Sequence, residues 1–285
     1  MELPYLSLNT NTLSERNNPP YKDDEPIVVS STTYSEIISI KPSTNPFPGA
    51  RFGPRAIRAA SARQTPLRGF NTRANLNPYR SWATILDCGD IPITPFDNAL
   101  ALRQVSEAFS ELGSRPSLSN PSSPVKLLAL GGDHSIALPE LRSLSKLHNQ
   151  PITVLHLDAH LDTWSPAAYD SSWLSADEPT EAQQSSFTHG SMFWLAWKEG
   201  LIANNSVHAG LRTRLQGVID HEDDTQQGWV RIASDAIDHD ELGPGGVAKL
   251  IMETIGVERP VYLSVDIDVL DPGLAPGTGG LTLAC

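Results

Sequence analysis

Cysteine, basic residues and long apolar runs are all scarce in this sequence, and each shortage argues against a class of protein. Of 285 residues only Cys88 and Cys285 are cysteines, and neither lies in a CxxC pair, which argues against a disulfide framework and a zinc ribbon. Lysine and arginine total 21 against 33 acidic residues, so the formal net charge is −12, which disfavours nucleic acid and anionic membranes as partners. No apolar segment approaches the roughly 18 residues needed to span a bilayer.

The N-terminal stretch carries no targeting signal and little regular pattern. Residues 1–17 have neither a basic start nor a sustained apolar run, so no signal peptide is expected and the predicted location is cytoplasmic. Residues 1–48 are rich in Pro, Ser, Thr and Asn, with short apolar runs only at Ile27–Val29 and Ile37–Ile40. We predict an irregular N-terminal arm over 1–48, followed by an α/β domain over 49–285.

Apolar strands alternate with helices along the second part of the chain. Strands are expected at 84–86, 125–130, 152–157, 207–211 and 261–265, and helices at 55–62, 98–112, 139–147 and 247–255. This alternation predicts a mostly parallel sheet that helices cover on both faces. Ligands in such folds bind beyond the carboxyl ends of the strands.

Aspartate and histidine directly follow three of the predicted strands. The three clusters are Gly131–Ser135, Asp158–Asp162 and Ser264–Asp268. In the second and third clusters the polar residues alternate, and period-two spacing places them on one side of an extended chain. One strand end can therefore present two or three ligands to a single point.

Convergence of the clusters would concentrate negative charge. It would bring together the carboxylates of Asp158, Asp162, Asp266 and Asp268. Two divalent cations would cancel the repulsion among these four groups, and His134 and His160 would add neutral nitrogen ligands. Ligands rich in oxygen and free of thiolate favour Mn²⁺ over zinc, with two ions per chain. Such a pair can hold a bridging hydroxide that attacks a planar carbon.

Simpler interpretations exist for each cluster alone. An Asp-x-His-x-Asp segment is usually a solvated loop or a helix cap. The segment Gly131–Ser135 could be a helix N-terminus capped by Asp133 or Ser135. Three such clusters in this order, each at the end of an apolar strand, favour the metal site.

The three clusters resemble the motifs of the ureohydrolases, the arginase and agmatinase family, in a match from about Gly49 to Gly279. Members have a three-layer α-β-α fold and hydrolyse guanidino compounds to urea and an amine at a binuclear manganese centre. The resemblance implies one ion held by His134, Asp158, Asp162 and Asp266, and a second held by Asp158, His160, Asp266 and Asp268, with Asp158 and Asp266 bridging. It also implies that His189 shuttles a proton to the leaving amine, although its spacing alone suits an ordinary surface histidine equally well.

The substrate that the resemblance implies is agmatine. Arg51–Arg58 and Phe187–Phe193 resemble agmatinases, whereas Thr163–Asp170 does not match the loop with which arginases bind an α-carboxylate and amine. We therefore expect a small cationic guanidino substrate, with agmatine split into putrescine and urea; arginine and guanidinobutyrate are the alternatives. No substrate-binding residue is assigned, and a complete chain is expected to form a homo-oligomer.

The sequence departs from the family at two places. Ser39–Phe47 offers Ser, Lys, Pro and Asn where members have an apolar first strand, and two prolines disfavour a central strand. After Ala275–Gly279 the family's Thr-Pro-Glu segment, its later strands and helices, and the glutamate that binds the guanidinium have no counterpart. Two hypotheses follow: a working amidinohydrolase, completed by an oligomer partner, or a truncated relative that binds metal without turnover.

Three further segments receive structural interpretations. His156 shares the strand parity of Asp158 and is expected to be a buried histidine in the core or behind the ligands. His221–Asp224 is expected to be a solvated charged loop. Gly243–Gly246 is interpreted as a turn that feeds a helix, because no Lys or Ser follows in P-loop spacing.

Overall fold

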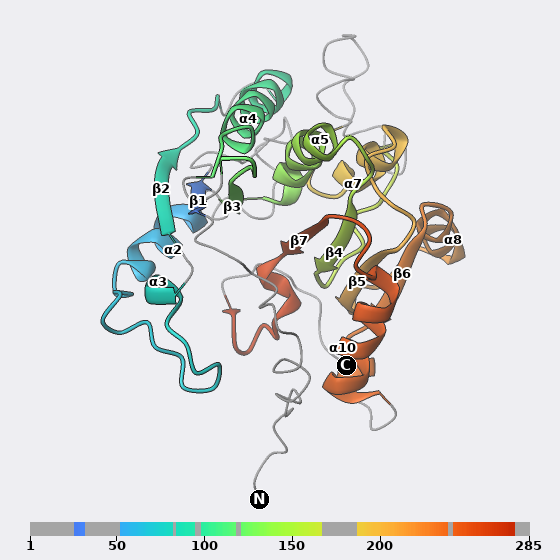
Figure 1. Ribbon diagram of the computed structural model, residues 1–285. Coiled ribbons are helices and arrows are strands. Elements are labelled where there is room, and N and C mark those ends of the chain that lie inside the picture. The colour runs from blue at the N-terminus through green and yellow to red at the C-terminus, as the bar shows by residue number, and fades with distance from the viewer. Residues whose placement is uncertain are drawn as a thin grey trace, which may run out of the picture.

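Parallel strands form the centre of the molecule, and helices cover both of their faces (Figure 1). The computed structural model describes residues 26–31, 52–81, 84–94, 98–117, 121–166, 187–238 and 242–276. The strands are β1 (Pro26–Ser31), β2 (Thr84–Asp90), β3 (Lys126–Leu130), β4 (Thr153–Leu157), β5 (Ser206–Leu211), β6 (Trp229–Ala233) and β7 (Val261–Val265). They pair in two groups, β2-β1-β3 and β6-β5-β4-β7, and every pair is parallel.

The helices lie between the strands in sequence. They are α2 (Gly53–Ser61), α3 (Pro78–Ser81), α4 (Asn98–Gly113), α5 (Ala137–His148), α7 (Met192–Lys198), α8 (Val218–Gln226), α9 (Asp235–Asp238) and α10 (Gly243–Ile255), with 3-10 turns η2 (His134–Ile136) and η5 (Ile267–Val269). In the part of the chain that the structure describes, none of these helices combines the length and the apolar character that a membrane crossing requires.

Different helices pack on the two faces of the four-stranded group. Val154 of β4 lies in one apolar cluster with Phe193 of α7, whereas Leu155 packs against a second cluster that contains Val247 of α10. Because successive strand side chains point to opposite faces, this parity also places His156 on the α7 side. The arrangement is the three-layer α-β-α architecture that the sequence predicts.

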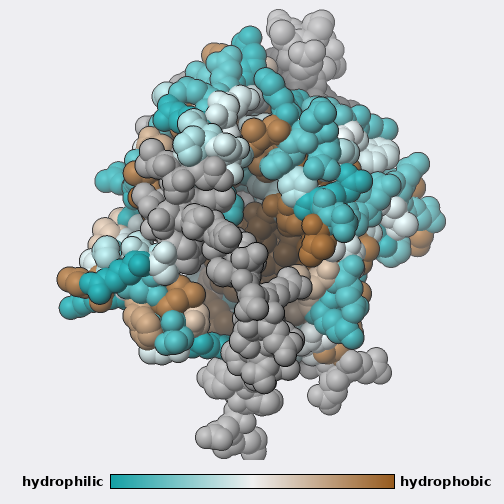
Figure 2. All heavy atoms as spheres, viewed as in Figure 1, coloured by the Kyte–Doolittle hydropathy of each residue, from teal (hydrophilic) through white to brown (hydrophobic). Residues whose placement is uncertain are grey.

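Strand β7 is covered unequally. Tyr262 packs against the cluster of α5 and α7, while Val261, Leu263 and Val265 on the alternate face are 47%, 57% and 57% exposed. Figure 2, in the same view, shows hydrophobic residues gathered around a hollow at the centre of the visible face, where Figure 1 places β7. One face of this strand is therefore packed and the other is open.

The prediction of an irregular arm over residues 1–48 is wrong at residues 26–31. Residues 26–31 form β1, which pairs with β2 on one side and β3 on the other, and Ile27 is in register with both Ile85 and Lys126. A short β-branched run suits a strand that has partners on both sides, whatever the composition around it. Ser39–Phe47 lies outside the described residues, and the domain boundary at residue 49 stays a prediction.

Each strand and helix predicted beyond residue 50 has a counterpart at its expected position. The prediction missed α7, α8, β6 and α9, and it assigned residues 63–81 entirely to loop although α3 lies within them. These elements have nine residues or fewer, and such short stretches do not show a clear period.

A close approach at Gly210 joins β5 to the turn after β7. Gly210 has φ of +99° and lies at the register shift between Ala209 and Leu211. A Cβ atom there would lie 2.5 Å from Cγ2 of Val269 and 3.3 Å from the backbone oxygen of Asp158. Glycine alone avoids both the unfavourable φ and the overlap, so it allows the ends of β4, β5 and β7 to meet.

We expect Gly210→Ala to lower the free energy of unfolding by about 1–3 kcal/mol, because it adds backbone strain and an atomic overlap. Urea denaturation followed by circular dichroism measures the change. Gly113→Ala is the matched control, since its Cβ would meet only side-chain atoms at 3.4 and 3.5 Å in a helix. Equal stabilities of the two variants would contradict the role assigned to Gly210.

Candidate metal centre

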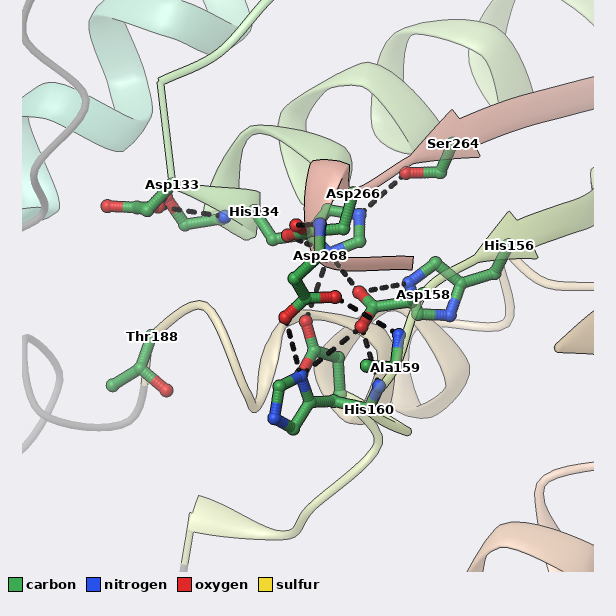
Figure 3. A network of polar contacts seen from close by, with 12 residues as sticks. Asp133, His134, His156, Asp158, Ala159, His160, Thr188, Ser264, Asp266 and Asp268 are labelled. Carbon is green, nitrogen blue, oxygen red and sulfur yellow. Dashed lines mark hydrogen bonds and ion pairs between the residues drawn. The ribbon is translucent and has the colours of Figure 1, made fainter. Parts of the chain in front are cut away.

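The three Asp/His clusters meet beyond the carboxyl ends of β3, β4 and β7 (Figure 3). His134 opens η2 shortly after β3, Asp158 is the first residue after β4, and Asp266 is the first residue after β7. Carboxyl ends of parallel strands lie at one edge of the sheet, so segments far apart in sequence reach the same point.

His134 is the centre of the first group of side chains. Its Nδ1 lies 3.1 Å from Asp158 Oδ2, 3.0 Å from Asp162 Oδ2 and 3.7 Å from Asp266 Oδ2. On the other side of the ring, Nε2 lies 2.6 Å from Ser264 Oγ. This second contact holds the ring so that Nδ1 faces the carboxylates. These are the four residues that the family resemblance implies for one ion.

His160 forms a second group with Asp158 and Asp268. Its Nδ1 lies 2.9 Å from Asp268 Oδ2 and 3.4 Å from Asp158 Oδ1. One ligand atom from each of the three residues lies within 4.8 Å of the others, and the same holds for His134, His156, Asp158 and Asp162. Asp158 belongs to both groups, which is the position of a bridging carboxylate. Asp266 reaches the first group through His134 Nδ1 at 3.7 Å but lies in neither set of mutually close ligand atoms. Its bridging role stays a prediction, as does the assignment of each side chain as a ligand.

Short-range hydrogen bonds set the direction of these side chains. Asp158 Oδ1 accepts from His160 N at 2.6 Å, Asp266 Oδ1 accepts from Asp268 N at 3.0 Å, and Asp133 Oδ1 accepts from Ser135 N at 2.9 Å. Asp133 therefore caps η2, as the simpler interpretation proposed, and the same turn delivers His134 to the cluster.

Asp162 adopts a backbone conformation that is uncommon for a residue with a side chain. Its φ is +53°, in the left-handed region, and its side chain is buried. Aspartate tolerates this region better than most residues, and non-glycine residues that adopt it are often functional. The turn thereby directs the Asp162 carboxylate toward His134.

Arg212, which the sequence analysis did not single out, holds the segment after β7. Its guanidinium donates to the backbone oxygens of Val269 and Leu270, both at 3.2 Å, and of Asp268. Its backbone N–H donates to the oxygen of Ala159 at 3.1 Å, and Ala159 N donates to Asp268 Oδ1 at 3.1 Å. Arg212 thus links the second and third clusters.

Histidines balance the charge of the carboxylates. Burial alone would lower the pKa of His134 and His160, but hydrogen bonds with aspartates raise the first well above its usual range and the second to about 10. Burial also opposes ionisation of Asp158, yet hydrogen bonds with three histidines lower its pKa. Burial, then the charge of Asp158, raises the pKa of Asp162, and burial raises that of Asp266 to about 6. In the metal-free site, protons on His134 and His160 supply the positive charge that bound cations would otherwise supply.

The donor set fits a pair of divalent cations. It offers carboxylate oxygens with a minority of imidazole nitrogens and no thiolate, and most of these atoms are buried. This composition suits Mn²⁺ or another hard-to-intermediate dication. A charge concentration of this kind is costly without cations, since like charges in a dry site repel strongly.

His189 lies at the rim of the cluster. It is exposed on the turn before α7, and its charge acts on Asp162. The Oγ atom of Ser191 lies 3.0 Å from both Thr188 N and Thr188 Oγ1, and Trp164 N donates to Gly190 O at 3.1 Å. These bonds tie the turn to the segment that follows the second cluster. The proton-shuttle role of His189 stays a prediction.

Behind the ligands lies His156, which is buried as expected. Its Nε2 lies 2.9 Å from Asp158 Oδ2, and burial lowers its pKa to about 3. The contact with Asp158 and the low pKa describe a neutral ring that supports a carboxylate, in agreement with the interpretation of His156 as a buried partner of the ligands.

The interpretation of His221–Asp224 as a solvated loop is wrong. These residues lie in α8, and Asp224 is fully buried, with its pKa lowered, against the effect of burial, chiefly by the hydrogen bond with His208. Asp224 also contacts Thr163 and Arg231. The acidic run itself does not show which residue is buried, because partners such as Arg231 lie in other elements.

Comparison with known proteins identifies the family. The model of the arginase family matches residues 37–283, and the chain belongs to that family. A Schizosaccharomyces pombe protein provisionally named agmatinase 1 is 40% identical over 242 residues, which is 81% of this chain and 58% of the relative. The agmatinase of Neisseria meningitidis serogroup A is 33% identical over 91% of this chain and 70% of its own length. The chain thus spans less than two thirds of the length of the yeast relative.

A solved structure supports the same fold. Proclavaminate amidinohydrolase from Streptomyces clavuligerus superposes with a TM-score of 0.69 at 33% identity, over 90% of this chain and 73% of that structure. The family relationship and the three-layer fold therefore agree.

Metal binding should release protons. At pH 7.5 the metal-free site holds protons on His134 and His160, which must leave before the rings can ligate a cation. Affinity for Mn²⁺ is therefore expected to rise about tenfold or more per pH unit, and to fall further below pH 6, where Asp266 is also protonated. In the metal-free protein, folding stability changes with pH in the opposite direction to Mn²⁺ affinity. The raised pKa of His160 stabilises the fold at low pH, and this contribution is lost as the pH rises to about 10.

Isothermal titration in buffers of different ionisation enthalpy counts the released protons. A Mn²⁺ affinity that is constant between pH 6 and 8 would contradict the protonated metal-free site.

Proposed function

We propose that this chain is a metal-dependent amidinohydrolase that splits agmatine into putrescine and urea at a pair of Mn²⁺ ions. The observation that carries the proposal is Asp158, whose two carboxylate oxygens face different histidines: Oδ2 faces His134 and Oδ1 faces His160. One carboxylate shared between two Asp/His groups is the arrangement that two adjacent dications need.

His134, Asp158, Asp162 and Asp266 would hold one ion, and Asp158, His160, Asp266 and Asp268 would hold the other. The bound pair would supply Lewis acidity that activates water toward a guanidinium carbon. The protein's own part is to fix the ligands through Ser264, Arg212 and the short-range aspartate bonds.

The remaining chemistry requires a proton donor for the departing amine. His189 is a candidate because it is exposed at the rim and its charge interacts with Asp162. Imidazole is the side chain that most often accepts and donates protons in catalysis. The amine leaves as a neutral species once that proton reaches its nitrogen.

Two motifs, Arg51–Arg58 and Phe187–Phe193, support agmatine as the substrate, as do relatives that bear the name agmatinase. The net charge of −12 favours agmatine, which has two positive groups, over arginine, whose carboxylate cancels one of its two positive groups. Another amidino substrate is the second candidate, because the superposed structure from Streptomyces clavuligerus is a proclavaminate amidinohydrolase.

An assay of urea release by the 285-residue chain loaded with Mn²⁺ tests the proposed function. We expect urea release from agmatine, little from arginine or guanidinobutyrate, and loss of activity on treatment with a chelator. Urea from arginine and not from agmatine would overturn the substrate assignment. Tight Mn²⁺ binding without urea from any guanidine would favour a metal-binding relative without turnover.

His189→Asn is expected to lower kcat by about 10²–10⁴-fold, because it removes the proton donor. Mn²⁺ affinity should be unchanged, since His189 lies outside both ligand groups. The control is His148→Asn, at the exposed end of α5. Equal kcat values for the two variants would remove His189 from the mechanism.

A further inference from the structure

A row of polar residues crosses the four-stranded group in register. His156 of β4 is paired with Ser264 of β7 on one side and with His208 of β5 on the other, and His208 is paired with Arg231 of β6. Residues in register on neighbouring strands share a face, so this polar row lies on one side of the sheet. Its β7 end contacts the ring of His134 through Ser264.

Within the polar row the two histidines link two carboxylates. The Nδ1 atoms of His156 and His208 lie 2.7 Å apart, the Nε2 of His156 lies 2.9 Å from Asp158 Oδ2, and the Nε2 of His208 lies 3.2 Å from Asp224 Oδ1. The series therefore runs from Asp158 through both rings to Asp224 on α8. Figure 3 shows its first step, with His156 directed at Asp158.

The three contacts in this series need three hydrogens on four ring nitrogens. Both carboxylates only accept, so each outer Nε2 must carry a hydrogen, and one more hydrogen must lie between the two Nδ1 atoms. His156 is neutral and donates its one ring hydrogen from Nε2 to Asp158, so its Nδ1 accepts the hydrogen on Nδ1 of His208. Asp224, which Arg231 and Thr163 also contact, fixes the far end.

Water cannot replace a lost member of the series. His156, His208 and Asp224 are each 0% exposed. Phe193 lies 4.8 Å from the ring of His156, and Trp229 stacks on His208 at 3.9 Å between centroids. In such a dry, aromatic environment an unpaired ring nitrogen costs the full desolvation of that group.

We propose that His208 and Asp224 are positioning residues, which keep the Nε2–H of His156 directed at Asp158 and so orient the carboxylate common to both ligand groups. The proposal rests on the metal site proposed above. A carboxylate that is free to rotate would present its two oxygens to two cations less often, and would bind them more weakly.

The test compares His208→Phe with the unchanged chain in titrations with Mn²⁺. Phenylalanine keeps a ring against Trp229 but cannot donate to His156, so we expect affinity to fall about tenfold or more. Asp224→Asn, which removes the charge at the far end, should lower affinity in the same direction. Because the two residues act in series, the double variant should lose no more than His208→Phe alone.

The matched control is Asp223→Asn, the same substitution one residue earlier on the exposed side of α8. A second readout is the rise in Tm that Mn²⁺ gives to each variant. A residue that only supports the fold would lower the Tm of the metal-free and the loaded protein equally, whereas a positioning residue reduces the rise itself.

The outcomes separate the two proposals. Mn²⁺ affinity in His208→Phe equal to that of the unchanged chain would overturn the positioning role and leave the metal site intact. Failure of the unchanged chain to bind Mn²⁺ would overturn both. If His208→Phe does not melt cooperatively, the titration of Asp224→Asn tests the proposal instead. A Mn²⁺ affinity of Asp224→Asn equal to that of Asp223→Asn would overturn the positioning role.

Discussion

Repulsion among carboxylates is the constraint on which the rest of this structure depends. Asp158 is buried beside Asp162, and the energy of two like charges in a dry site is several times larger than in water. The fold compensates with hydrogen-bond donors placed around each carboxylate, from backbone N–H groups to His134 and His160. Bound dications would stabilise this arrangement further, because they neutralise the carboxylates directly, whereas each hydrogen bond offsets only part of the repulsion.

The strand ends of the site could be predicted because the relevant information is local. Asp158, His160 and Asp162 follow an apolar run, and Asp266 and Asp268 follow another, so period-two spacing and the edge rule for parallel sheets suffice to bring them together. The same alternation predicted that His156 is buried behind Asp158, and this prediction is confirmed. Recognition of the family supplied the pairing of residues with ions, which spacing alone leaves open.

Other features depend on contacts that no local pattern reveals. Asp224 appeared to belong to a charged loop, but it is buried because Arg231, Thr163 and His208 approach it from three other segments. The strand β1 was not predicted because its β-branched run is short and lies in a polar stretch, and its pairing with strands on both edges is not visible in the local sequence. The register that aligns His156 with His208 is likewise a property of the assembled sheet.

The unequal packing of β7 has a consequence for local stability. The strand that delivers Asp266 and Asp268 buries Tyr262 on one face but leaves Val261, Leu263 and Val265 largely open on the other, so it buries less apolar surface than β4. Elements with less buried surface open more often without global unfolding. Two of the proposed ligands, Asp266 and Asp268, thus directly follow a strand whose amide hydrogens should exchange earlier than those of β4, which precedes Asp158. Cations bound at both strand ends would slow that exchange.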